Sequence, residues 1–230
     1  MALGYWYLLV FIGNMPKKEI AIKHATILAS YLLIVWGFYR FLFKLPEEVE
    51  EFVIKPLIWL IPVFYLLKKE KLGVTSLGLT TKNLFQSFYL SLALGAFFAI
   101  EGVIVNFIKY EGQIVFLANV GQRNFWISLV LSLATAISEE LSFRGFIFNR
   151  VWHALGTEWS ANLLTSFVWA LIHIPIAIFW WDLSLGGTVG YLLLTTIFGI
   201  GSAYLFARTR NVISSIFLHV LWAWPIVLFR

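Results

Sequence analysis

The sequence has little of what a water-soluble protein needs and none of what thiol chemistry needs. Its 230 residues include no cysteine, so disulfides and thiolate chemistry are excluded. Charged residues make up only 13%, against about 25% in a typical soluble domain, whereas hydrophobic residues reach 60%. A soluble fold of this composition would expose large apolar patches to water. The composition therefore excludes an ordinary soluble domain.

Long apolar runs take the place of the missing polar residues. A helix of about 17 to 25 apolar residues crosses the hydrocarbon core of a bilayer, and seven such runs occur, at 25–43, 52–67, 84–108, 125–150, 161–181, 188–206 and 212–229. They do not show the alternation of membrane β-strands. We predict an all-α fold, a polytopic transmembrane helix bundle of seven or eight spans.

The domain organisation follows from these runs. Residues 1–24 are expected to form an N-terminal interfacial or partial-span segment, because their apolar start is short and lacks the basic region of a signal peptide. Residues 25–230 are expected to form a single transmembrane helical domain. The net charge of +5 is better explained by loops beside anionic lipid headgroups than by nucleic-acid binding. The acidic run at 46–51 is predicted to start a solvated helix.

Charged residues inside one run are the informative exceptions. The run 125–150 contains Glu139, Glu140 and Arg144, and each charge costs about 2.5 to 3.5 kcal/mol at mid-bilayer on insertion scales. Glu140 and Arg144 are four residues apart and can pair on one helix face, whereas Glu139 finds no partner on its own helix. This pattern leaves Glu139 available as a base. An ion network that only holds the bundle together explains the charges equally well.

Two histidines strengthen the functional interpretation. His173 and His219 lie near the middle of later runs, at about the depth of Glu139, and Pro175 is expected to kink the helix beside His173. A carboxylate and a neutral imidazole can hold and deprotonate a water molecule, while a second imidazole stabilises an oxyanion. The same atoms could bind zinc instead, although no local ligand spacing supports this.

Three segments, in order, resemble one known family. The stretch SEELSFRGF (138–146) resembles its EExxxR motif, and SFVWALIHIP (166–175) is similar to its second motif, with Trp169 where phenylalanine is usual. The run 198–224 resembles the third region, which leads to His219. The family is the CAAX protease and bacteriocin-processing (abortive-infection) family of glutamyl intramembrane proteases.

The resemblance implies an intramembrane endopeptidase, a hydrolase that needs no metal and no cofactor. Glu139 and His173 would activate water, His219 would bind the oxyanion, and Glu140 and Arg144 would support the site. The implied partners are membrane lipids and a peptide or protein substrate, such as a prenylated CAAX-like tail or a leader peptide, with no nucleic acid. The implied location is a prokaryotic cytoplasmic membrane. The catalytic core of the chain is expected at about residues 125–229.

One position departs from the family pattern. The family has an asparagine four residues after the last histidine, and this chain has Ala223. Loss of one oxyanion donor typically lowers turnover by about 10²- to 10³-fold. Trp222 and Ser215 share a helix face with His219 and are the expected substitutes. The departure also motivates a different interpretation, a non-catalytic membrane binding or immunity protein; a transporter is less well supported, because the sequence lacks repeated half-helices.

Overall fold

The computed structural model describes residues 15–114 and 125–229. Every regular element in these two ranges is helical, which confirms the all-α fold. The helices, several of them continued by π-helical (η1, η2, η5, η6) or 3-10 (η3) turns, are α2 (Lys18–Tyr31), η1 (Leu32–Trp36), α3 (Gly37–Leu42), α4 (Glu47–Val49), η2 (Glu50–Ile54), α5 (Lys55–Glu70), η3 (Val74–Leu77), α6 (Leu84–Lys109), α7 (Phe125–Glu140), η5 (Leu141–Phe148), α8 (Asn149–Leu155), α9 (Glu158–Ile172), η6 (Ile176–Trp180), α10 (Leu185–Thr209) and α11 (Val212–Phe229).

The helices coincide with the predicted apolar runs. The largest difference is at the N-terminus, where the first long helix begins at Lys18 and not at residue 25. The predicted boundary at residue 24 therefore falls inside a helix. The second run is also longer than predicted, because α4, η2 and α5 continue one another from Glu47 to Glu70. Residues 1–13, the proposed eighth span, lie outside the described residues.

Several of the helices can cross a membrane. By length and composition, five are long and apolar enough: Lys18–Leu42, Leu84–Ile108, Trp126–Leu155, Glu158–Trp180 and Leu185–Thr209. Val212–Ala223 is a shorter apolar helix. The outer surface carries large apolar side chains, among them Phe85 and Leu185, each 82% exposed. These features show a multi-pass membrane protein, and the count of seven or eight spans stays a prediction.

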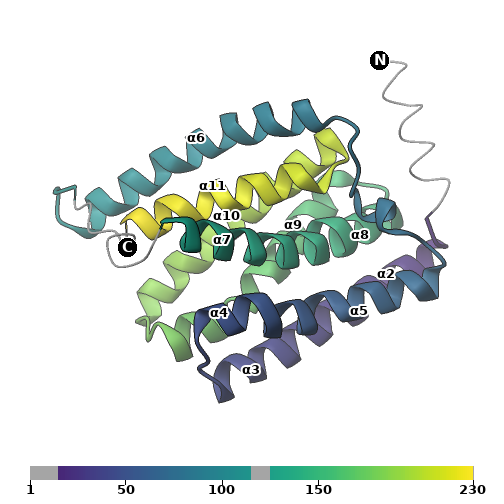
Figure 1. Cartoon of the computed structure of the whole chain (residues 1–230), viewed down its shortest axis with the longest axis horizontal. Helices are drawn as coiled ribbons and strands as arrows, with labels where there is room; N and C mark the ends of the chain where they lie inside the picture. Colours follow the sequence, from purple (N-terminus) through teal and green to yellow (C-terminus); the bar gives the residue numbers. More distant parts are fainter. Residues whose placement is uncertain (1–14, 115–124, 230) are drawn as a thin grey trace.

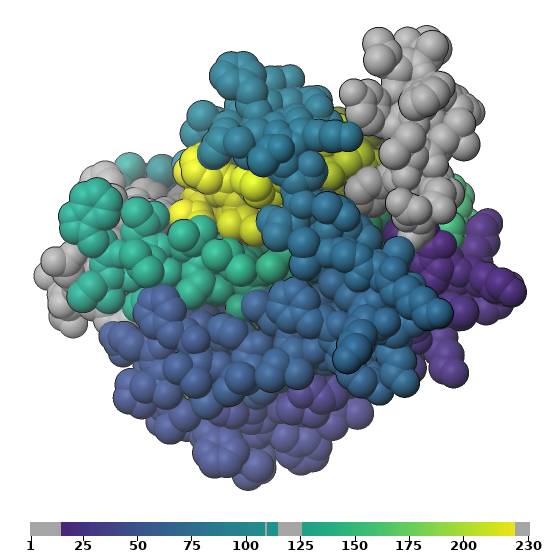
Figure 2. Space-filling model, turned by 45° about the vertical axis from the view of Figure 1, so that its right-hand side comes forward, coloured from purple at the N-terminus to yellow at the C-terminus, as the bar shows by residue number. Residues whose placement is uncertain are grey.

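The long helices run side by side in layers (Figure 1). α6 lies on one outer side against α11, and α2 to α5 form the opposite side. The space-filling view shows α7 between them, in contact with the α4–α5 rod (Figure 2). The layer between these two sides includes α7 and α11, which contain Glu139 and His219, and α9, which ends directly before His173.

Helix irregularities occur beside two of those residues. The π-helical turn η5 begins directly after Glu140, and π-helical turns often occur at functional sites. α9 ends at Ile172, His173 forms a turn, and Pro175 precedes η6. Because proline has no backbone N–H, it interrupts the hydrogen-bond ladder at this point. The predicted break beside His173 is confirmed.

Candidate active site

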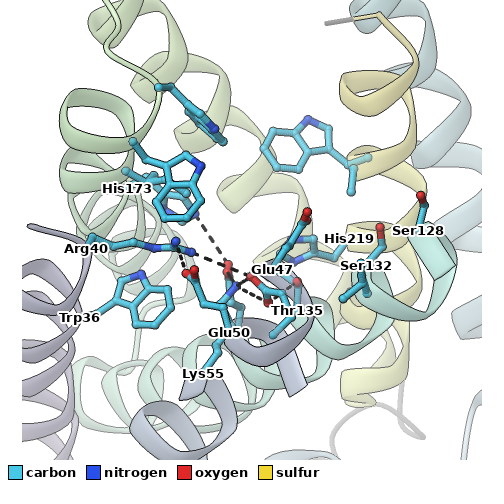
Figure 3. Close-up of a pocket in the computed structure, with 18 of the residues that line it drawn as sticks. Trp36, Arg40, Glu47, Glu50, Lys55, Ser128, Ser132, Thr135, His173 and His219 are labelled. Carbon is cyan, nitrogen blue, oxygen red and sulfur yellow. Dashed lines mark hydrogen bonds and ion pairs between the residues drawn. The ribbon is translucent and has the colours of Figure 1, made fainter. Parts of the chain in front are cut away.

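A cavity of about 590 Å³ opens between the N-terminal elements, from η1 to α5, and the elements α7, η6, α10 and α11. Five residues singled out in the sequence line it, namely Glu139, His173, His219, Trp222 and Ala223. The rest of its wall is aromatic, charged and polar, with Trp36, Arg40, Glu47, Glu50, Glu51, Lys55, Ser128, Leu131, Ser132, Thr135, Ile176, Trp180, Trp181 and Tyr191. Figure 3 shows Lys55, Glu50 and Thr135 between Arg40 and Trp36 on one side and His219 on the other. The expected layer of titratable groups is thus one site.

Glu139 is held at both of its carboxylate oxygens. Its Oε2 accepts a hydrogen bond from the indole Nε1 of Trp169 at 3.2 Å and lies 3.7 Å from Nε2 of His173. Its Oε1 lies 3.0 Å from the ammonium Nζ of Lys55. Glu139 has no partner on its own helix, as expected, but it is not unpaired, because a lysine of α5 reaches it.

His173 has an assigned proton position. Its Nδ1 lies 2.8 Å from the backbone carbonyl oxygen of Trp169. A carbonyl oxygen only accepts hydrogen bonds, so Nδ1 carries the proton and, in the neutral ring, Nε2 presents a lone pair toward Glu139. The break after α9 places the ring there, because His173 occupies the first non-helical position.

Glu140 forms a separate buried network. Its Oε1 accepts from Nη1 of Arg144 at 3.1 Å and lies 2.7 Å from Nδ1 of His219, while its Oε2 accepts from the hydroxyl of Ser202 at 2.8 Å. The predicted pairing of Glu140 with Arg144 is confirmed. The contact with His219 was missed, because sequence spacing carries no signal for a pair that lies 79 residues apart. Glu140 therefore orients the imidazole of His219.

The two expected substitutes for the missing asparagine lie in different places. Trp222 lines the cavity and its ring stacks on Phe198, with the ring centroids 4.3 Å apart. Ser215 is fully buried, does not line the cavity, and donates its hydroxyl hydrogen to the carbonyl of Ser202 at 3.0 Å. The single hydrogen that Ser215 can donate thus already has a partner outside the cavity, which makes Ser215 the less favoured of the two predicted substitutes. Trp222 remains the favoured candidate for the second oxyanion donor, because it lines the cavity.

The N-terminal helices contribute buried charged side chains to the cavity, two of which were expected to face solvent. The acidic run was expected to be solvated, but Glu50 and Glu51 are only 1% and 6% exposed and line the cavity. Arg40 and Lys55 are buried beside them. A signal for Lys55 does exist in the sequence, since it lies inside an apolar run four residues after a glutamate.

The described side chains offer no obvious metal site. In residues 15–114 and 125–229, no three histidine, aspartate or glutamate side chains are arranged so that they could hold a metal ion. Glu139 interacts with a lysine and an indole, and Glu140 with an arginine and a serine. The described geometry therefore gives the zinc alternative no support.

The cavity places charged side chains inside a bundle of apolar helices. Residues 121–225 match the family model described as type II CAAX prenyl endopeptidase Rce1-like. The match contains Glu139, His173 and His219, and it confirms the resemblance to the CAAX protease family. This part of the chain, somewhat less than half of it, is thus similar to a family of membrane proteases. No curated protein and no solved structure gives a significant match.

Proposed function

We propose that this protein is a glutamyl intramembrane endopeptidase that hydrolyses a peptide bond with a water molecule held by Glu139 and His173. The observation that carries this proposal is the approach of Glu139 Oε2 to His173 Nε2, at 3.7 Å, in the cavity wall. Both atoms are acceptors, and 3.7 Å is too long for a direct hydrogen bond. One water molecule can donate a hydrogen to each, which leaves its oxygen lone pairs free to attack a carbonyl carbon.

The reaction then needs one proton transfer in each direction. The water oxygen bonds to the carbonyl carbon, and its proton passes to the Glu139–His173 pair. The same pair returns a proton to the amide nitrogen as the carbon–nitrogen bond breaks, so that one water molecule is consumed per bond cleaved. Lys55 and Trp169 keep the carboxylate in place through both steps.

His219 is the proposed oxyanion donor, and its contacts define how it can donate. Its Nδ1 faces the carboxylate of Glu140 at 2.7 Å, so this nitrogen carries a proton. Nε2 then donates to an oxyanion only in the imidazolium form. A positive ring in a site of low dielectric is a strong oxyanion partner. The indole N–H of Trp222 is the proposed second donor, in the place of the missing asparagine.

The proposed substrate is a membrane-associated peptide or protein, such as a prenylated CAAX-like tail or a leader peptide. A volume of about 590 Å³ accommodates a short peptide segment and not a folded domain. The aromatic part of the wall, which includes Trp36, Trp180 and Trp181, suits apolar side chains or a lipid chain. The proposed mechanism uses only side chains of the protein, with no metal and no cofactor.

The test is cleavage by the full-length protein in lipid nanodiscs. Prenylated tails, leader peptides and a mixed peptide library are incubated with and without a chelator, and products are identified by mass spectrometry. We expect chelator-resistant cleavage that Glu139→Gln and His173→Ala abolish and that Arg208→Met, a change in an exposed ion pair, leaves intact. Cleavage that persists in Glu139→Gln would refute the proposal, and chelator-sensitive cleavage would favour a metal enzyme.

A second candidate function is a non-catalytic membrane binding or immunity protein on the same scaffold. Ala223 in the cavity wall favours it, because an oxyanion donor of the family is missing there. In that case the library would contain peptides that bind the protein and are not cleaved. Their affinity would be the same for the wild type and for Glu139→Gln.

A further inference from the structure

Lys55 is a buried cation outside the part of the chain that matches the family model. It lies at the start of α5, where η2 ends, and is only 3% exposed. Its Nζ lies 2.9 Å from Glu51 Oε1 and 3.0 Å from Glu139 Oε1. One ammonium group therefore bridges a carboxylate of its own helical rod and the proposed general base on α7.

The bridge continues into a network of buried charges. Glu51 accepts a hydrogen bond at 2.5 Å from the hydroxyl of Thr135, one turn before Glu139 on α7. Arg40 of α3 forms an ion pair with Glu50 and approaches Glu51 at 3.9 Å. Two polar contacts, Glu51 with Thr135 and Lys55 with Glu139, thus join the continuous helix α4–η2–α5 to α7 at positions one turn apart. The ion pair of Arg40 with Glu50 joins α3 to the same helix. This arrangement fixes the position of Lys55 relative to Glu139.

A carboxylate at this depth needs a cation in order to stay ionised. Burial favours the neutral acid, and a nearby positive charge favours the carboxylate. Arg144 is the cation of the motif, but its guanidinium is bound to Glu140 and to the carbonyl of Gly199. Among the described residues, Lys55 is the one lysine or arginine whose side chain forms an ion pair with Glu139.

We propose that Lys55 is a positioning residue of the hydrolytic site, which keeps the Glu139 carboxylate ionised and turned toward His173. The inference rests on the proposed function, and it extends the site to a helix that the family match does not reach. By occupying Oε1, Lys55 leaves Oε2 for the indole of Trp169 and for the water shared with His173. The proposed hydrolytic site therefore includes Lys55 from the N-terminal part of the chain as well as residues inside the family match.

The inference predicts a specific pH response. Without Lys55, the carboxylate of Glu139 loses its compensating charge, so we expect the acid limb of the kcat profile to move to higher pH. The other charged or titratable groups around the pair stay in place, namely Arg40 on α3, Glu47 on α4, Glu50 and Glu51 on η2, Glu140 on α7, Arg144 on η5, His173 after α9, Tyr191 on α10 and His219 on α11. A role limited to stability would lower the amount of folded protein and leave the acid limb where it is.

The kinetic test compares Lys55→Met, Lys55→Arg and Arg208→Met in nanodiscs. For Lys55→Met we expect kcat at neutral pH to fall by about 10²-fold, the lower end of what a general base contributes, with partial recovery at higher pH. Lys55→Arg should restore most of the activity because it keeps the charge, and Arg208→Met should match the wild type. An unshifted acid limb with wild-type kcat in Lys55→Met would overturn the inference.

An infrared measurement tests the inference without relying on turnover. At neutral pH, Lys55→Met should show a protonated carboxyl band that is absent from the wild type and from Lys55→Arg, and that disappears in Lys55→Met/Glu139→Gln. Absence of this band in folded Lys55→Met would contradict the inference. If the band appears as expected while the wild type and Glu139→Gln cleave peptides equally, the proposed function fails and the role of Lys55 in ionising Glu139 stands.

Discussion

The substitution Ala223→Asn offers a gain-of-function test of the oxyanion site. Ala223 lies four residues after His219 and Trp222 lies three after it, so both share its helix face, and both line the cavity. A side-chain amide at position 223 would point its N–H into the region where the oxyanion forms. Replacing alanine there adds a donor without removing a buried group.

The expected magnitude depends on whether Trp222 already serves as the second donor. One oxyanion donor contributes about 10²- to 10³-fold in kcat, or about 2.7 to 4 kcal/mol. Trp222→Phe removes the indole N–H and keeps an aromatic ring stacked on Phe198. We therefore expect Trp222→Phe to lower kcat by about 10²-fold, and Ala223→Asn to recover most of that loss in the double variant. In the wild-type background, Ala223→Asn should raise kcat much less.

The assay is steady-state cleavage of one peptide by the four proteins of this double-mutant cycle. A donor used only in the transition state changes kcat with little change in KM. If both single variants and the double variant match the wild type, Trp222 is not a donor and position 223 is out of reach of the oxyanion. If Ala223→Asn alone raises kcat by about 10²-fold, the position has been vacant in this protein.

Two further substitutions test the support of the site and of the bundle. Trp169→Phe removes the hydrogen bond that the indole N–H donates to Glu139 at 3.2 Å. A hydrogen bond to a charged group contributes about 1.5 to 3 kcal/mol, so we expect kcat to fall at least tenfold without loss of folding. An unchanged kcat would show that this hydrogen bond is dispensable. Gly199→Ala places a Cβ 2.9 Å from the Cβ of Ser166 and should lower the free energy of unfolding by about 1 to 3 kcal/mol. In the control variant Gly186→Ala, the added Cβ meets nothing within 4 Å, so the change should be neutral or slightly stabilising. Equal thermal stability of the two variants would contradict this packing.

Most of the helices could be predicted from the sequence, because a bilayer restricts the secondary structure that an apolar run can form. A run of the right length must be a helix, since its backbone polar groups have no other partners in lipid. The bounds of α6 and α11 show this, as the predicted run 84–108 became a helix at 84–109 and the run 212–229 was recovered unchanged. The run 52–67 was less well placed, because the polar turns before it lack an apolar signal.

The candidate site was predictable only in part. Helical spacing was enough to pair Glu140 with Arg144, because that contact is local. The contacts of Lys55 with Glu139 and of His219 with Glu140 span 84 and 79 residues, and such pairs depend on how the helices pack. Composition also misled the interpretation of Glu50 and Glu51, since an acidic run at the start of a helix is usually solvated. The two glutamates are buried because cations on neighbouring elements compensate their charge.

The charges around the cavity show why the proposed oxyanion needs donors of its own. The buried side chains there include four carboxylates, of Glu50, Glu51, Glu139 and Glu140, and three cations, of Arg40, Lys55 and Arg144. An uncompensated charge is costly in a low-dielectric interior, and an oxyanion would add a further negative charge beside these carboxylates. The Nδ1 of His219 contacts Glu140 at 2.7 Å, which fixes the imidazole at the cavity wall. The proposed mechanism therefore depends on hydrogen bonds from His219 and from a second donor at Trp222, and not on a spare lysine or arginine, to stabilise the oxyanion.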